Sequence, residues 1–235
     1  MSQYRKIKAG SVHVLTSLGA VCALFAVRAT VGQAFEQAYA WLGLALLIDG
    51  IDGYFARRFA VKTVLPHVSG ETLDLCVDYV TYVFVPALML VLGPLPGTWG
   101  MMLAALICIT SLYHFSDERS KSEDHCFVGF PAIWNIVAFY IFALALPDWA
   151  SSLLILACCA LTFVRWKWVH PMRVVARREF TLALTGVWAL DAATILWSGF
   201  PAGWATSFVI VSIAVYSVVL SLLFGRASHA EKSVE

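Results

Sequence analysis

Charged residues are scarce in this sequence. Only 13% of the 235 residues are Asp, Glu, Lys or Arg, whereas 60% are hydrophobic. A soluble domain of this length needs more charge to keep its surface in water, so the composition excludes a soluble globular protein. The 16 basic and 15 acidic residues nearly cancel, so no net field favours nucleic acid as a partner. The composition instead predicts an all-α polytopic integral membrane protein built as a helical bundle.

Other common sequence features are missing as well. The six cysteines lie mostly within apolar runs without even spacing, so we predict neither a disulfide framework nor a zinc site. The N-terminal stretch lacks a small-x-small cleavage site, so we expect the first apolar helix to be retained. No internal repeat divides the chain. We therefore expect one membrane domain over 1–235, with a short cytoplasmic or interfacial segment at 1–11 and a tail at 225–235.

Long apolar runs are abundant. A spanning helix needs about 20 predominantly apolar residues, and turn-forming segments such as GPLPG at 93–97 separate runs of about this length. We expect about eight transmembrane helices, at 12–33, 35–59, 71–92, 98–116, 130–147, 149–165, 179–199 and 203–224. With both termini cytoplasmic, all but one of the 16 Lys and Arg residues fall on the inner side, Arg28 being the exception. The positive-inside rule therefore supports this orientation.

Four aspartates lie where an apolar helix is least expected to carry charge. Asp49 and Asp52 fall near the cytoplasmic end of the second expected helix, and Asp74 and Asp78 in the first two turns of the third. Spacings of three and four residues keep each pair on one helix face, and the two helices run in opposite directions, so both pairs reach about the same depth. Four carboxylates in one pocket repel one another unless cations lie among them. Hard oxygen ligands favour magnesium, manganese or calcium.

Glycine and arginine accompany these acids. Gly50, Gly53 and Gly70 leave room for a backbone or a bulky ligand to approach closely, and Arg57 is suited to clamp a phosphate. Carboxylates, a divalent ion and an arginine together indicate chemistry on a diphosphate. The residues alone do not decide which of the four carboxylates acts as a general base.

The pattern Asp49-x2-Asp52-Gly53-x2-Ala56-Arg57, followed by Gly70-x3-Asp74-x3-Asp78, closely resembles the signature of the CDP-alcohol phosphotransferases. These membrane enzymes transfer a phosphoryl-linked group from a CDP-alcohol to an acceptor hydroxyl and release CMP. The spacer between Arg57 and Gly70 is longer than in many members. This longer spacer, the eight-span layout and GFPAIWN at 129–135 look like the bacterial branch of the family whose acceptor is choline.

The resemblance implies a role for each residue of the pattern. Two divalent ions, manganese or magnesium, would be held by Asp49, Asp52, Asp74 and Asp78. The nucleotide would be bound by Asp52, Gly53, Ala56, Arg57 and Gly70. Asp78 would be the general base that takes the proton of the acceptor hydroxyl, whose oxygen attacks the lipid-side phosphorus of CDP-diacylglycerol. The enzyme would act in the bacterial inner membrane with its active site facing the cytoplasm, and a homodimer is a candidate assembly.

The residues constrain the acceptor less strongly. Apart from Arg57 and Arg58, the inner halves of expected helices two to five are poor in Lys and Arg, whereas a phosphorylated acceptor would call for further basic residues. A quaternary ammonium such as choline binds to aromatic faces. The candidates for its site are Tyr79, Tyr82, Tyr113, Trp134 and Asn135. Tyrosine and tryptophan also form interfacial belts, so serine, ethanolamine or a polyol phosphate stays open as acceptor.

Two charged residues within the expected membrane helices lie outside the matched pattern, and their roles stay open. Asp191 lies midway along the seventh expected helix, where an ionisable group is by default a candidate for function. A structural ion pair with Arg28, if the two helices are neighbours, and a subunit contact are equally open, and neither residue belongs to the matched pattern. A cation-coupled transporter would also carry acids within the membrane, but near its midplane and often between inverted repeats. The four aspartates instead cluster at one membrane face, which favours the enzyme.

Overall fold

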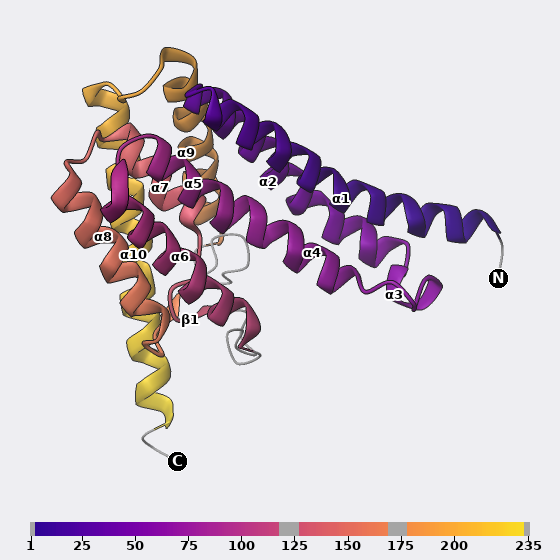
Figure 1. The fold of residues 1–235 in the computed structure, drawn as a ribbon. Helices are drawn as coiled ribbons and strands as arrows, with labels where there is room; N and C mark the ends of the chain where they lie inside the picture. The colour runs from indigo at the N-terminus through magenta and orange to yellow at the C-terminus, as the bar shows by residue number, and fades with distance from the viewer. Residues whose placement is uncertain (1–2, 118–126, 169–177, 233–235) are drawn as a thin grey trace. The chain divides into compact units, whose positions relative to one another are not determined.

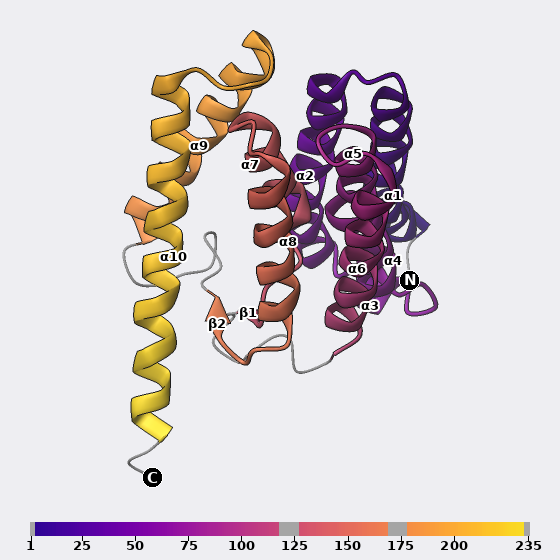
Figure 2. The same ribbon diagram turned by 60° about the vertical axis from the view of Figure 1, so that its left-hand side comes forward.

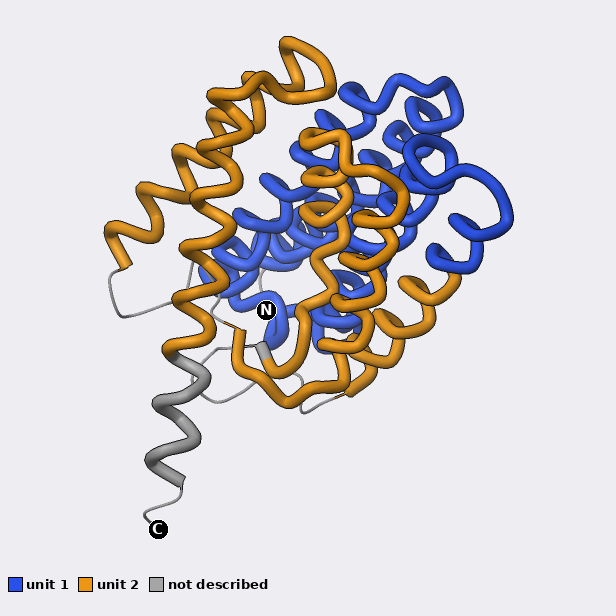
Figure 3. The backbone as a smooth tube through the Cα atoms, turned by 90° about the vertical axis from the view of Figure 1, so that its left-hand side faces the viewer, with its two compact units in different colours: residues 1–104 blue, residues 105–235 orange. Residues whose placement is uncertain are grey.

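The computed structural model describes residues 3–117, 127–168 and 178–232. The chain forms two compact units, residues 1–104 and residues 105–235 (Figure 3). Helix α6, Gly97–Ser116, begins in the first unit and ends in the second.

All regular elements in the described residues of unit 1 are helices. Its elements are α1 (Gln3–Val31), α2 (Phe35–Arg58), α3 (Val61–Val64), α4 (Gly70–Asp78), the π-helix η1 (Tyr79–Phe84) and α5 (Val85–Leu92). Figure 1 shows α2 leading into the short α3, from which α4 runs back. The long spacer between Arg57 and Gly70 therefore contains a helical turn of its own.

Unit 2 adds four helices and a small ribbon to the second half of α6. Its elements are β1 (Phe127–Val128), α7 (Trp134–Ala143), α8 (Asp148–Thr162), β2 (Lys167–Trp168), α9 (Arg178–Ser198) and α10 (Trp204–Lys232). Figure 2 shows α8 and α10 as long helices of this unit. The two short strands pair antiparallel, Phe127 with Trp168. Since every other described element is a helix, the all-α class is confirmed.

Each expected apolar window coincides with a helix or a continuous run of helices. Five of these stretches are long and apolar enough to cross a membrane: Gln3–Val31, Gly70–Leu92, Gly97–Ser116, Arg178–Ser198 and Trp204–Leu223. Helix α2 has 24 residues, but its aspartates lower its hydropathy, and α7 and α8 are shorter apolar helices. The chain is thus a polytopic membrane protein, while the count of eight spans and the cytoplasmic termini stay predictions.

Helix α1 is the centre of unit 1, because it packs against α2, α3, α4, η1 and α5. Its buried residues are mostly small, among them Gly19, Ala23 and Ala26. Small side chains let helix backbones approach closely in a membrane protein. At Gly19 the two helices approach closely, because a Cβ atom there would lie 2.5 Å from Cγ1 of Val77 in α4.

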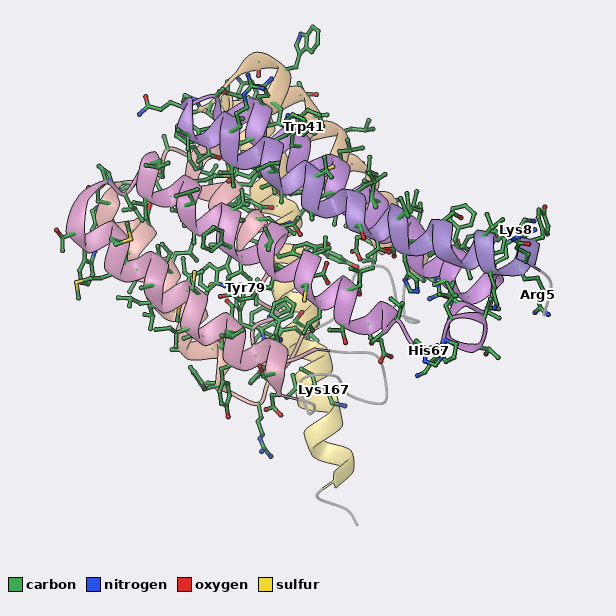
Figure 4. The ribbon with its side chains drawn as sticks, turned by 45° about the vertical axis from the view of Figure 1, so that its right-hand side comes forward. Arg5, Lys8, Trp41, His67, Tyr79 and Lys167 are labelled. Carbon is green, nitrogen blue, oxygen red and sulfur yellow. The ribbon has the colours of Figure 1, made fainter. Side chains whose placement is uncertain are left out.

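The first turns of α1 pack onto α3. Ala9 and Val12 form a buried apolar cluster with Val61 and Val64. Lys8 lies in the same region, with its Nζ 5.6 Å from the centre of the Phe59 ring, and Figure 4 shows it at the N-terminal end of α1. The expected N-terminal segment is therefore helical from Gln3 and continuous with α1, and it helps to hold the connection that leads to α4.

The helix from Gly70 to Leu92 changes its winding directly after Asp78. Its start is capped by Ser69, whose side chain accepts a hydrogen bond of 3.1 Å from the backbone N–H of Thr72. Across η1 the backbone widens, and the N–H of Val85 donates to the carbonyl of Val80, five residues earlier. Pro86 follows, and in an α-helix its ring would clash with the carbonyl four residues before it. A wider turn relieves that clash, and such turns are frequent at functional sites.

We expect Gly19→Ala to lower the midpoint of thermal unfolding in detergent. The new methyl group would meet a β-branched side chain that has little rotamer freedom, and overpacking of this kind costs about 1–3 kcal/mol. Gly43→Ala is the matched control, because a Cβ atom at Gly43 in α2 meets nothing within 4 Å. Adding Val77→Ala to the Gly19 variant should restore the midpoint. A Gly19→Ala protein as stable as the control would contradict this close contact.

Candidate active site

Three aspartates from two helices meet in unit 1. One carboxylate oxygen of each of Asp49, Asp74 and Asp78 lies within 4.8 Å of the others, and all three residues are half-buried. Asp49 comes from the C-terminal half of α2, and the other two lie one turn apart on α4. The structure thus brings together one member of the first expected pair and both members of the second.

This group of oxygens suits a hard divalent cation. Oxygens that share one such ion at about 2.0–2.6 Å lie up to about 5 Å apart, which matches the spacing of the three carboxylates. Their mutual repulsion in a half-buried place disfavours three bare negative charges and favours a bound cation. Carboxylates are the ligands that magnesium, manganese and calcium prefer, and the arrangement alone does not choose among these ions.

Asp52 lies outside this group of three. Its side chain is only 6% exposed, and its Oδ2 accepts a hydrogen bond from the hydroxyl of Thr16 in α1. A buried carboxylate needs such a donor, because a buried carboxylate oxygen without a hydrogen bond lowers the stability of the fold. Sequence reasoning missed Thr16. The available signal was a polar residue near the middle of this helix, within its apolar run.

Tyr82 touches the carboxylate group directly. Its hydroxyl donates a hydrogen bond of 3.0 Å to Oδ2 of Asp49, and it lies in η1, the π-helical turn that follows Asp78. Tyr79, labelled in Figure 4, comes from the same turn. The sequence singled out both tyrosines as candidate contacts for an acceptor. The structure adds that the hydroxyl of Tyr82 orients one of the three carboxylates.

The residues expected to bind a nucleotide surround the same end of α2 and α4. The side chain of Arg57 is exposed and folds back along α2, so that a Cβ atom at Gly53 would lie 3.5 Å from its Nη1. Ala56 packs against the apolar cluster of α1 and α3, where a larger side chain would separate the helices. Gly70 is the first residue of α4.

The remaining acceptor candidates belong to unit 2. Trp134 is fully buried, and its indole N–H donates to the hydroxyl of Ser111 at 2.7 Å. The structure therefore places Trp134 in the core of unit 2. The side-chain oxygen of Asn135 accepts from the backbone N–H of Ile136 at the start of α7. Tyr113 is exposed and lines a pocket of about 380 Å³ within unit 2.

Asp191 and Arg28 lie in different units. Oδ2 of Asp191 is buried in α9, and no hydrogen bond to it is found among the residues that the structure describes. Arg28 lies in the last turn of α1. An ion pair between them, or a subunit contact made by either, stays a prediction.

Comparison with known proteins gives consistent matches. The family model described as CDP-alcohol phosphatidyltransferase matches residues 12–164. A phosphatidylcholine synthase of Pseudomonas aeruginosa is 41% identical over 197 residues, which are 83% of this chain and 83% of the relative. One of Bradyrhizobium diazoefficiens is 44% identical over 88% of this chain and 78% of its own length. One of Rhizobium johnstonii is 36% identical over 94% of this chain and 92% of the relative.

We expect Tyr82→Phe to weaken the binding of manganese about tenfold, as other losses of a hydrogen bond to a metal ligand do. In this variant the carboxylate of Asp49 loses the hydroxyl donor that orients it. The aromatic ring at position 82 is retained. Binding can be measured by electron paramagnetic resonance of the free ion during titration of the purified protein. Tyr54→Phe is the matched control, because the exposed Tyr54 hydroxyl bonds only to Arg58 in the hydrogen bonds found on α2. Equal manganese affinity in the two variants would show that Asp49 does not need Tyr82.

Proposed function

Since the chain belongs to the CDP-alcohol phosphatidyltransferase family, we propose that it transfers the phosphatidyl group of CDP-diacylglycerol to choline and releases CMP. The observation that carries this proposal is the group of three carboxylates at Asp49, Asp74 and Asp78. These residues belong to the signature pattern, and the fold gathers them from distant parts of the sequence into a space suited to a divalent cation.

The reaction is a single in-line displacement. A divalent ion, manganese or magnesium, would stabilise the negative charge that develops on the diphosphate. Two such ions would be held by Asp49, Asp74 and Asp78, with Asp52 as the fourth carboxylate. Asp78 accepts the proton of the choline hydroxyl. The hydroxyl oxygen forms a bond to the lipid-side phosphorus, and the bond from that phosphorus to the bridging oxygen breaks, so that CMP departs with the electron pair.

The nucleotide half of the substrate is held by the residues around the ends of α2 and α4. The exposed guanidinium of Arg57 lies over Gly53 and is suited to bind a phosphate oxygen with paired hydrogen bonds. Gly70 opens α4 one turn before Asp74, so a ligand that touches Gly70 lies beside the carboxylates. Ala56 contributes by its small size, since it lets α1 and α3 pack beside the site.

Choline fits the aromatic residues that follow Asp78. Tyr79 and Tyr82 lie in the π-helical turn directly after this residue, and aromatic faces attract quaternary ammonium groups. The relatives that match most of the chain are phosphatidylcholine synthases, which also supports choline over serine, ethanolamine or a polyol phosphate. Tyr113, Trp134 and Asn135 stay candidates that the arrangement within unit 1 does not involve.

The proposed place of action is the cytoplasmic side of a bacterial inner membrane. Several helices have the length and hydropathy of membrane spans, and the matching relatives are bacterial. The distribution of Lys and Arg along the sequence supports the cytoplasmic side, because the predicted topology places the aspartates near the membrane face that carries these residues.

The decisive experiment measures CMP release by the purified protein with CDP-diacylglycerol and manganese. Choline, serine, ethanolamine, inositol and glycerol 3-phosphate are supplied in separate reactions. We expect release with choline alone, and none after chelation of the metal. Release with a different acceptor would overturn choline but keep the site. No release by protein shown to be folded would overturn the proposal and favour the transporter.

We expect Asp78→Asn to reduce turnover about 10²–10⁴-fold, which is the usual contribution of a general base. The amide cannot accept the hydroxyl proton, whereas the nucleotide site is left in place. Affinity for CMP, measured by isothermal titration calorimetry, should therefore change little. Asp148→Asn, at an exposed position in the first turn of α8, is the control for the loss of one charge. An Asp78→Asn enzyme with normal turnover would refute the assignment of the base.

A further inference from the structure

His13 lies beside the proposed nucleotide site, on the face of α1 that borders the signature residues. It is three residues from Thr16, so the two side chains share a helix face. Thr16 bonds to Asp52. The ring of His13 lies next to the start of α4, where a Cβ atom at Gly70 would be 3.4 Å from Cε1 and 3.9 Å from Nδ1. One face of α1 thus contacts two residues of the signature.

The ring of His13 carries an unsatisfied nitrogen. Nε2 is buried, and no hydrogen-bond partner for it is found among the described residues. The hydrogen bond of Ser17 goes to the backbone carbonyl of His13 and leaves the ring untouched. A buried polar atom without a partner costs about 1–3 kcal/mol, so most such atoms in native proteins have one. The missing partner of Nε2 therefore calls for an explanation.

A structural role and a role as metal ligand both explain this nitrogen poorly. A histidine that only fills space has no need of a buried, unpaired nitrogen, since leucine fills a similar volume without that cost. His13 also does not join the group of potential metal ligands, which contains Asp49, Asp74 and Asp78. A ligand that lies against Gly70 and offers a hydrogen-bonding group to the ring would satisfy this nitrogen.

We propose that Nε2 of His13 forms a hydrogen bond with the nucleotide half of CDP-diacylglycerol. This inference rests on the proposed function, since it assumes that a cytidine nucleotide occupies the space beside Gly70. Cytosine, ribose and phosphate all carry hydrogen-bonding atoms, and an imidazole nitrogen can donate or accept. His13 is then a substrate-binding residue outside the signature pattern, contributed by the helix that also positions Asp52.

The test compares three substitutions of His13 by their affinity for CMP. Glutamine places its amide nitrogen about where Nε2 lies, asparagine places it nearer Nδ1, and leucine retains volume without a hydrogen-bonding group. We expect His13→Asn and His13→Leu to weaken CMP binding roughly threefold to tenfold, as the loss of one hydrogen bond does. His13→Gln should bind CMP nearly as the unaltered protein does. The KM for CDP-diacylglycerol should follow the same order while that for choline stays constant.

His67→Gln is the matched control, because this histidine is exposed in the connection between α3 and α4 (Figure 4). Thermal unfolding of each variant shows whether the fold is retained. Unchanged CMP affinity in the folded leucine variant, or an effect confined to the KM for choline, would overturn the proposal. Calorimetry with CMP needs no turnover. A failure of the proposed function in the acceptor experiment therefore stays distinguishable from a failure of His13 to bind the nucleotide.

Discussion

The repulsion among three carboxylates is the constraint on which unit 1 depends. Asp49, Asp74 and Asp78 are held within 4.8 Å of one another in a half-buried place, and nothing in their own chemistry favours that proximity without a cation. Helix packing supplies the rigidity. The close contact at Gly19 brings α1 against α4, and the hydroxyl of Tyr82 restrains the carboxylate of Asp49. Unit 1 therefore pre-organises a group of acids that could hold a divalent cation, which would offset the repulsion between them.

Helix α1 has a larger part in this site than an apolar first helix usually has. Its small residues allow close packing with four neighbouring helices and the π-helical turn. The same face carries Thr16, which satisfies the buried carboxylate of Asp52. The helix thus supports the site in two ways, since it sets the distance between α2 and α4 and also provides a hydrogen bond to a signature residue.

The sequence predicted the fold class, the helix positions and most of the carboxylate group. Hydrophobic windows locate helices well, and the i, i+4 spacing of Asp74 and Asp78 leaves no doubt that they share a face. The separation of Asp52 from Asp49 could not be predicted, because it depends on a partner in α1 that only tertiary packing brings near. Trp134 illustrates the same limit. An aromatic residue at the start of a helix has the same sequence pattern whether its side chain faces a ligand or the core. The π-helical turn leaves no mark on hydropathy, although Pro86 is a local reason for it.

That π-helical turn also changes how the faces of its helix relate to each other. A π-helix of this length adds one residue relative to an α-helix over the same rise, and each α-helical residue rotates the chain by about 100°. The helix face that precedes Tyr79 and the face that follows Phe84 are therefore rotated relative to each other by about 100°. A helical wheel drawn with a single pitch through residues 70–92 would place the acids of α4 and the buried side chains of α5 in the wrong angular relation. One inserted residue thus lets a single transmembrane segment present polar ligands at one end and a fully apolar face at the other, each in its own direction.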